Sequence, residues 1–277
     1  MAHSTPPSHD APTRGPADSP PATEPVAAGL RSTSLDQRRR SAPLWGLALI
    51  AIGLAVIPLD PIAVRAARAV SLAGDLRREL ELLQQFGAPA SILIAALLIA
   101  SLDPQRFRRF LDLLLAAGVM SLTALAGKVI IGRPRPRFDD PFAFNGFWNA
   151  YPIPRRDDPT ATDLIHSFQL GADRVEQLWS MPSSHTTAAV TFAVFLAVLY
   201  PRLRLFAVGM AALVASCRVL FGAHYPSDVL VGAGFAVLIA TPLIRSGAGV
   251  RLLDAIWLRF IDKDATPAWP RMNGAPD

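Results

Sequence analysis

Six long apolar segments dominate this chain of 277 residues and constrain its fold more than any other feature. They lie near residues 43–59, 88–102, 110–131, 184–200, 203–221 and 227–245. About 20 apolar residues in a helix span a bilayer, and these segments approach or reach that length. Only 18% of the residues are charged, against about 25% in soluble globular proteins. We therefore predict an all-α, polytopic membrane protein, built as a bundle of six transmembrane helices.

Two further stretches have the pattern of amphipathic helices that lie at a membrane interface, one near residues 72–83 and one near 252–260. The N-terminal stretch, rich in Pro, Ala, Ser and Thr, has no apolar periodicity and is expected to be disordered. The predicted organisation is a disordered cytoplasmic tail (1–42), a membrane domain (43–246) with a long outer loop (132–183), and an interfacial C-terminal helix and tail (247–277).

Arginines cluster in the short loops before the first segment, between the second and third, between the fourth and fifth, and after the sixth. The positive-inside rule makes that side cytoplasmic, so both termini are predicted inside and the 132–183 loop outside. The arginine-rich composition and short loops favour a bacterial inner membrane. Because the arginines of this chain, with its net charge of +5, follow segment ends, we expect a lipid bilayer and no nucleic acid as partner. The sequence leaves the oligomeric state open.

Three polar motifs lie at the outer ends of these segments. The first runs from Lys128 to Pro136 (KVIIGRPRP), the second is PSSH at 182–185, and the third runs from Arg218 to Asp228 (RVLFGAHYPSD). Together they bring cations, hydroxyls, imidazoles and a carboxylate to one membrane face. Phosphoryl transfer needs such a set, because fixed cations stabilise the charge on the equatorial oxygens beside a nucleophile and a general acid.

The third motif places His224 four residues before Asp228, with Pro226 favouring a helix start between them. The Asp228 carboxylate is then expected to accept a hydrogen bond from one imidazole nitrogen and leave the other free to attack. A His–Asp pair that only holds a loop is the alternative interpretation of this motif.

The other two motifs also have plain structural interpretations. Ser183 and Ser184 open an apolar segment, where they either cap a helix or help its free N–H groups to bind an anion. His185 lies inside that segment, where histidine is rare and usually functional. Lys128 and Arg135 either bind phosphate or are interfacial cations whose side chains reach the headgroups.

With these residues in place, the chain resembles the membrane-bound type 2 phosphatidic acid phosphatase family, which is related to the vanadium-dependent haloperoxidases. The family pattern Lys-x6-Arg-Pro fits Lys128 and Arg135, and the six-residue gap selects Arg135 over Arg133. Pro-Ser-Gly-His fits residues 182–185 with Ser184 in the glycine position, and Ser-Arg-x5-His-x3-Asp fits the third motif with Cys217 in the serine position. The resemblance covers about residues 43–246.

The resemblance implies a role for each residue of the motifs. His224 would attack phosphorus and form a phosphohistidine, Asp228 would orient His224, and His185 would protonate the leaving alkoxide. The phosphate-binding groups would be Lys128, Arg135, Ser183, Ser184 through its backbone N–H, and Arg218. The family needs no metal, and no other cofactor is implied.

We therefore predict an integral membrane lipid phosphatase with its active site at the outer, periplasmic face. Undecaprenyl diphosphate, phosphatidylglycerol phosphate, phosphatidic acid and lipid A are the candidate substrates. A lipid phosphotransferase would use the same intermediate, and a transporter or anion channel built on the same helices is an alternative of a different class. A vanadate-binding peroxidase is disfavoured by the membrane segments.

Overall fold

The computed structural model describes residues 42–70 and 73–269. The predicted disordered tail over 1–42 lies outside the described residues except for Ala42, and so does the end of the predicted C-terminal tail, residues 270–277.

A helix occupies each of the six apolar segments. These helices are the first helix (Ala42–Ala55), α4 (Pro89–Leu102), α5 (Phe110–Ile131), α6 (Ser184–Leu199), α7 (Arg204–Leu220) and α8 (Pro226–Arg245). Short 3-10 turns lie beside several of them, at Ile57–Leu59, Pro104–Arg109, Pro136–Phe138, Val175–Leu178 and Pro201–Leu203. Each turn except Val175–Leu178 has a proline in its first two positions, where the missing N–H costs nothing.

Three stretches of the described chain are long and apolar enough to cross a membrane, namely Pro104–Phe138, Pro201–Leu220 and Pro226–Arg245. The first helix continues into Ile57–Ala69 through a bend of 44°, and this bent pair makes a fourth span if it is counted as one. α4 and α6 are apolar but shorter. The number of six transmembrane helices therefore stays a prediction, whereas the helical, apolar character of the chain is confirmed.

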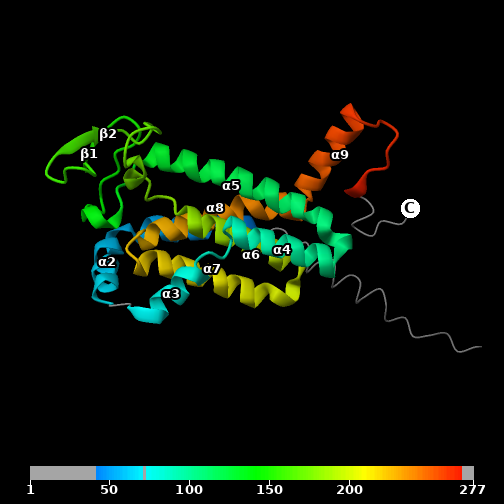
Figure 1. Ribbon diagram of the computed structural model, residues 1–277, viewed down its shortest axis with the longest axis horizontal. Coiled ribbons are helices and arrows are strands. Elements are labelled where there is room, and N and C mark those ends of the chain that lie inside the picture. The colour runs from blue at the N-terminus through cyan, green and yellow to red at the C-terminus, as the bar shows by residue number, and fades with distance from the viewer. Residues whose placement is uncertain (1–41, 71–72, 270–277) are drawn as a thin grey trace, which may run out of the picture. The chain divides into compact units, whose positions relative to one another are not determined.

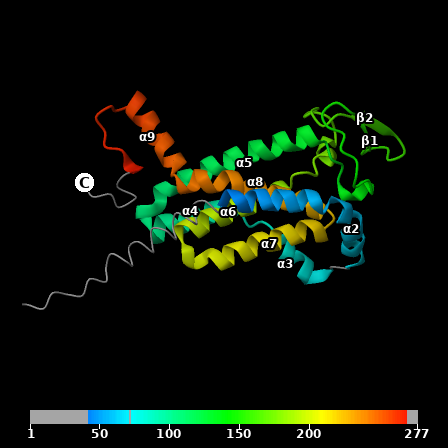
Figure 2. The same cartoon turned by 180° about the vertical axis from the view of Figure 1, so that it is seen from behind.

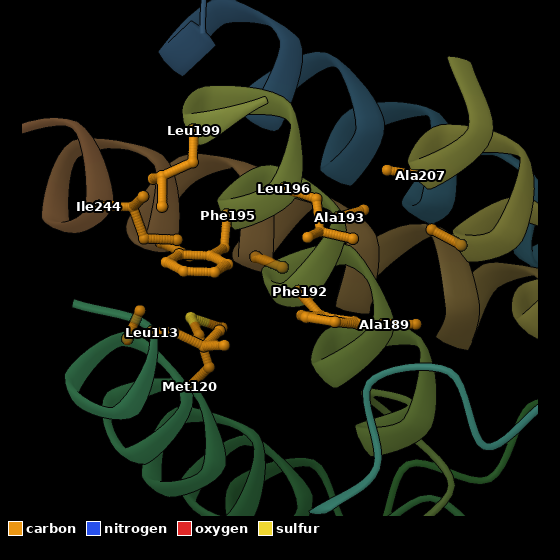
Figure 3. Close-up of a cluster of buried hydrophobic side chains, with 14 of the residues drawn as sticks. Leu113, Met120, Ala189, Phe192, Ala193, Phe195, Leu196, Leu199, Ala207 and Ile244 are labelled. Carbon is orange, nitrogen blue, oxygen red and sulfur yellow. The ribbon is translucent and has the colours of Figure 1, made fainter. Parts of the chain in front are cut away.

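α6 is the central helix, because it packs against α5, α7 and α8. Its buried face is apolar along most of its length, with Phe195 and Leu199 turned toward Ile244 of a neighbouring helix (Figure 3). Alanines between these large side chains let the helices approach closely, as is usual where helices pack in a bilayer. The result is one continuous apolar core below the polar motifs.

The first helix lies along α8 (Figure 2), and glycines on both helices let the two backbones approach closely. A side chain at Gly46 would come within 2.9 Å of a backbone nitrogen of α8, and one at Gly234 within 2.8 Å of the Gly46 carbonyl oxygen. Only glycine permits this backbone-to-backbone approach. The contact fixes where the chain bends into α2 (Asp60–Ala69), which matters for the site below.

The long loop between α5 and α6 contains the one β-sheet of the described residues. Strands β1 (Tyr151–Pro154) and β2 (Thr162–Ile165) pair antiparallel, with Tyr151 opposite Ile165. The strictly all-α prediction is wrong here, because Ile153 and Ile165 find a small core of their own with Val175 and Leu178. A hairpin with an apolar face over such a core needs no further strands.

The hairpin and α2 lie at one end of the bundle, and α9 (Ala248–Phe260) lies at the other (Figure 1). α3 (Gly74–Leu83) and α9 are amphipathic, as expected from their sequences, and leave Leu76, Leu82, Leu253 and Phe260 exposed. Their location at a membrane interface stays a prediction.

Candidate active site

All three motifs meet at the end of the bundle that carries the hairpin. Lys128 lies in the last turn of α5, Ser184 and His185 open α6, Arg218 is in the last turn of α7, and Asp228 lies in the first turn of α8. Antiparallel neighbours in a bundle bring the end of one helix beside the start of the next, which explains why residues 100 positions apart converge.

His224 lies in the tight connection between α7 and α8, which folds back on the end of α7. The backbone N–H groups of Ala223 and His224 both donate to the carbonyl of Arg218, at 3.0 and 3.1 Å. The imidazole is buried, and its Nδ1 contacts the carbonyl oxygen of Ser180 at 2.7 Å. A carbonyl can only accept, so Nδ1 carries the proton and Nε2 is left with its lone pair. No described residue forms a hydrogen bond with Nε2, which leaves it free to act as a nucleophile.

Asp228 is buried beside His224, but it does not accept the expected hydrogen bond. Its Oδ2 lies 3.7 Å from His224 Nδ1, beyond hydrogen-bond length. The carboxylate oxygens are already held by three donors, which are Arg133 at 2.7 Å, the Ser180 hydroxyl at 2.6 Å and the Tyr225 N–H at 2.8 Å. Asp228 therefore acts on the imidazole by its charge and through Ser180, while the Ser180 carbonyl fixes the tautomer.

Burial lowers the pKa of His224 to about 4, with the Asp228 carboxylate opposing the shift and the nearby charges of Arg135 and Arg218 adding to it. A histidine in water has a pKa near 6.5. The imidazole is therefore neutral at neutral pH, which is the form that a nucleophile requires.

Arg135 and Arg218 act on this imidazole, and Lys128 lies with these two cations. Among the ion pairs of the described residues, none includes Lys128, Arg135 or Arg218. Among the described residues, the Arg135 guanidinium donates only to the carbonyls of Glu176 and Ala223, at 3.0 and 3.3 Å. The charges of Arg135 and Arg218 both act on Lys128, so the three lie together. Such a concentration of unneutralised positive charge is typical of an anion-binding site.

The side chain of Arg218 is anchored through one terminal nitrogen. One of its terminal nitrogens donates to Gln84 Oε1 at 3.2 Å, while its Nε is buried and has no partner among the described residues. A buried donor left unsatisfied is costly, and a bound anion would satisfy it.

The start of α6 adds backbone donors to the cations. Ser183 is the N-cap residue and is fully buried, yet its side chain makes no capping hydrogen bond, and its hydroxyl instead accepts from Thr186 at 3.1 Å. The first N–H groups of this helix, near Ser184 and His185, are therefore available to an anion. The charges of Lys128 and Arg218 act on His185, as would a protonated His224, which places the His185 imidazole in the same cluster.

The two arginines of the first motif have different surroundings. Arg133 is fully buried and pairs with Asp60 and Asp228, at 2.7 Å each. Its guanidinium also stacks over the ring of Tyr225, 4.0 Å from the centroid. Arg135 is only partly buried and lies among the other cations. Arg135 therefore lies with the other cations of the site, whereas Arg133 lies behind them, and the choice of Arg135 as the phosphate ligand stays a prediction.

Sequence reasoning missed the residues that hold the site residues in place, which we call the supporting layer. They are Asp60, Ser180, Ser227 and Gln84; the first three are fully buried, and Gln84 is nearly so. The single acid that ends the first apolar segment was a usable signal for Asp60, because a charge in that position needs a partner. Cys217, which stands in the serine position of the family pattern, is buried and packs as a small apolar residue.

An apolar cavity of about 430 Å³ opens beside the cation cluster, between α4, α5 and α6. Lys128, Ser184 and His185 form its polar end. The remainder is mostly apolar and includes Ile92, Leu113, Met120, Ala124 and Leu125. The cavity can hold a hydrocarbon chain whose charged end reaches the cations.

The chain is similar to known proteins along part of its length. The family model described as the PAP2 superfamily matches residues 109–249. Lipid A 1-phosphatases of Rhizobium johnstonii (strain DSM 114642 / LMG 32736 / 3841) and Rhizobium etli (strain ATCC 51251 / DSM 11541 / JCM 21823 / NBRC 15573 / CFN 42) are 38% and 37% identical over 82 residues, which is 28% of this chain. The match spans about a third of those relatives, 34% and 35% of their lengths.

A solved structure is also similar. It is a crystal structure of a transmembrane PAP2-type phosphatidylglycerolphosphate phosphatase from Bacillus subtilis, with 24% sequence identity and a TM-score of 0.48. The alignment covers 74% of this chain and 93% of that one.

Proposed function

The chain belongs to the PAP2 superfamily, and from this premise we propose that it hydrolyses the phosphate ester or terminal diphosphate of a membrane lipid. One observation carries the proposal. Among the described residues, Lys128, Arg135 and Arg218 lie together and form no ion pair with a carboxylate, and two of them act on the neutral, buried imidazole of His224, whose Nε2 has no hydrogen-bond partner there.

The cations and the start of α6 supply the binding site for a phosphoryl group. Lys128, Arg135 and Arg218 neutralise its charge, and Ser183 with the N–H groups near Ser184 and His185 adds hydrogen-bond donors. Charge that spreads over the equatorial oxygens during transfer then meets donors that need no rearrangement.

His224 is the proposed nucleophile. Its Nε2 attacks phosphorus, the N–P bond forms, and the bond between phosphorus and the leaving oxygen breaks. His185, which takes up a proton when the anionic substrate binds beside it, gives that proton to the leaving oxygen, which departs as an alcohol or a shorter phosphate. The phosphorylated ring becomes cationic, because Nδ1 keeps the proton that it donates to Ser180, and the Asp228 charge 3.7 Å away stabilises it.

Water completes the reaction in this proposal. His185, now neutral, takes a proton from the attacking water as its oxygen bonds to phosphorus. The N–P bond breaks, inorganic phosphate is released, and His224 returns to its neutral form. No step uses a metal ion, and this metal independence is part of the proposal.

The apolar cavity favours a lipid over a water-soluble ester. Its polar end is formed by Lys128, Ser184 and His185, while its walls are the apolar faces of α4, α5 and α6. A single-chain or multi-chain lipid could place one hydrocarbon tail there, with the phosphate at His224. About 0.8 kcal/mol for each buried CH₂ would add to the binding of the headgroup.

The named relatives make lipid A the first substrate to test, because both are lipid A 1-phosphatases. Undecaprenyl diphosphate, phosphatidylglycerol phosphate and phosphatidic acid are the other candidates. We further propose a bacterial inner membrane, with both termini cytoplasmic and the site open to the periplasm, because the arginine-bearing ends lie opposite the motifs.

The test is phosphate release by the purified protein in detergent from these four lipids, with EDTA present. Release that persists in EDTA and is lost in His224→Ala is the expected result. A parallel reaction with an added lipid alcohol measures transfer in place of hydrolysis. No release and no transfer from any of the four, by folded protein, would contradict the proposal.

A further inference from the structure

Three buried charged side chains form a row behind His224. Asp60 begins α2, Arg133 follows the end of α5, and Asp228 lies in the first turn of α8; all three are fully buried. Arg133 NH2 lies 2.7 Å from Asp60 Oδ2, and Arg133 NH1 lies 2.7 Å from Asp228 Oδ1. One guanidinium thus joins two carboxylates that are 168 positions apart in the chain.

Asp60 also holds the start of α8 in place. It accepts a hydrogen bond from the Ser227 N–H at 3.1 Å and another from the Ser227 hydroxyl. The same hydroxyl accepts from Arg133 at 2.7 Å. Within the described residues, every polar group in contact with the Asp60 carboxylate is a hydrogen-bond donor, and two of these donors belong to Ser227, in the turn of helix that carries Asp228.

The charges of this row matter to His224. Two carboxylates and one guanidinium leave one net negative charge, and the Asp228 end of the row faces the imidazole at 3.7 Å. Without Asp60, the Arg133 guanidinium would pair with Asp228 alone, and the two opposite charges would cancel. The imidazole becomes positive when it is phosphorylated. It would then have no net negative charge beside it to stabilise it, although charges interact strongly in a buried site.

We propose that Asp60 is a positioning residue of this enzyme. Asp60 shares the charge of Arg133, so that Arg133 does not cancel the charge of Asp228, and it holds Ser227 at the start of α8. The negative charge of Asp228 can then stabilise the cationic phosphohistidine at His224. The inference rests on the proposed function. It extends the site beyond the part of the chain that the family model matches, because Asp60 precedes residue 109.

The experiment compares Asp60→Asn with the double variant Asp60→Asn/Arg133→Gln, which removes one carboxylate and the guanidinium and so restores one net negative charge. Asp60→Asn is expected to lower kcat by about 10- to 100-fold, the range typical for residues that orient a reacting group, with little change in KM. The double variant is expected to recover part of that loss. Asp139→Asn, which removes an exposed ion pair with Arg68, is the matched control and keeps wild-type kcat.

A merely structural role would give a different pattern. The double variant would then lose more activity than Asp60→Asn, because a second buried partner is removed, and KM would change together with kcat. Either that result or unchanged kcat in Asp60→Asn would overturn the inference. Thermal unfolding of each variant in detergent shows whether a loss of activity comes from unfolding of the protein or from the changed charge in a folded protein.

Orthovanadate gives a second measurement that does not need lipid turnover. It takes the five-coordinate geometry of a transferring phosphoryl group, and its binding to His224 is followed as an increase in the unfolding temperature. Binding is expected to weaken about tenfold or more in Asp60→Asn, by the same charge argument, and to recover in the double variant. If the wild type binds vanadate but hydrolyses no lipid, the proposed substrate class is wrong and this series still decides the role of Asp60. If the wild type does neither, both proposals fail.

Discussion

Arg133 and Arg135 are two residues apart, but we expect their substitution to have different main effects, one on stability and the other on activity. Arg133 is fully buried between two buried carboxylates, whereas the Arg135 guanidinium, within the described part of the chain, bonds only to carbonyl oxygens. Arg133→Gln should therefore cost stability first, and Arg135→Gln should cost activity first. Each variant is the other's matched control.

The magnitudes follow from these surroundings. Removing one partner of a buried ion pair costs about 3–5 kcal/mol, because a charge stays buried without its counter-ion, and here two carboxylates lose the same guanidinium. For a chain of this size that corresponds to a fall of about 6–20 °C in the unfolding temperature. Arg135→Gln loses hydrogen bonds of about 1 kcal/mol each but relieves repulsion from Lys128, so its stability should change by about 1 kcal/mol or less.

Activity should show the reverse order in kinetic terms. Loss of one donor to the transferring phosphoryl group lowers kcat/KM by about 10²–10³, and Arg135→Gln is expected in that range. The assays are thermal unfolding in detergent, followed by circular dichroism, and phosphate release from the best lipid substrate. An Arg133→Gln protein as stable as wild type, or an Arg135→Gln protein with wild-type kcat/KM, would refute the division of roles.

Two further predictions concern the buried histidine and the wall of the cavity. His224 binds a proton only near pH 4 when folded but near 6.5 when unfolded, so it contributes stability above pH 6.5 that is lost as pH falls toward 4. Wild type should lose about 2–3 kcal/mol more than His224→Gln over this range in thermal unfolding; equal pH slopes would contradict it. Gly87→Ala would place Cβ 2.7 Å from the Ala189 backbone and should cost about 1–3 kcal/mol more than Gly74→Ala, which shares the positive φ but meets nothing within 4 Å. Equal unfolding temperatures for the two alanine variants would contradict the predicted clash.

The helices and the motifs were predictable because their signals are local. Apolar runs marked the six helices to within a few residues, and His224, His185 and Lys128 stood out as polar groups at the edges of such runs. Spacing alone also distinguished Arg135 from Arg133. These inferences need only neighbours along the chain.

The supporting layer was not predictable, because its partners are distant in sequence. Ser227 finds Asp60 across 167 positions, and nothing local to either residue names the other. The four-residue spacing brought Asp228 close to His224, but the competing donors Arg133 and Ser180 decided that a backbone carbonyl takes the hydrogen bond. The hairpin was missed because prolines flank Ile153, which hides the strand alternation.

Detection of a covalent phosphoenzyme tests the central claim most directly. The protein is mixed with a lipid labelled with ³²P in its phosphate, quenched in alkali, digested, and the labelled peptide is sequenced. We predict acid-labile label on His224 that is absent in His224→Ala, because the attacking atom is its Nε2. Phosphate release from the lipid with no label on His224, or with label on another residue, would contradict the account.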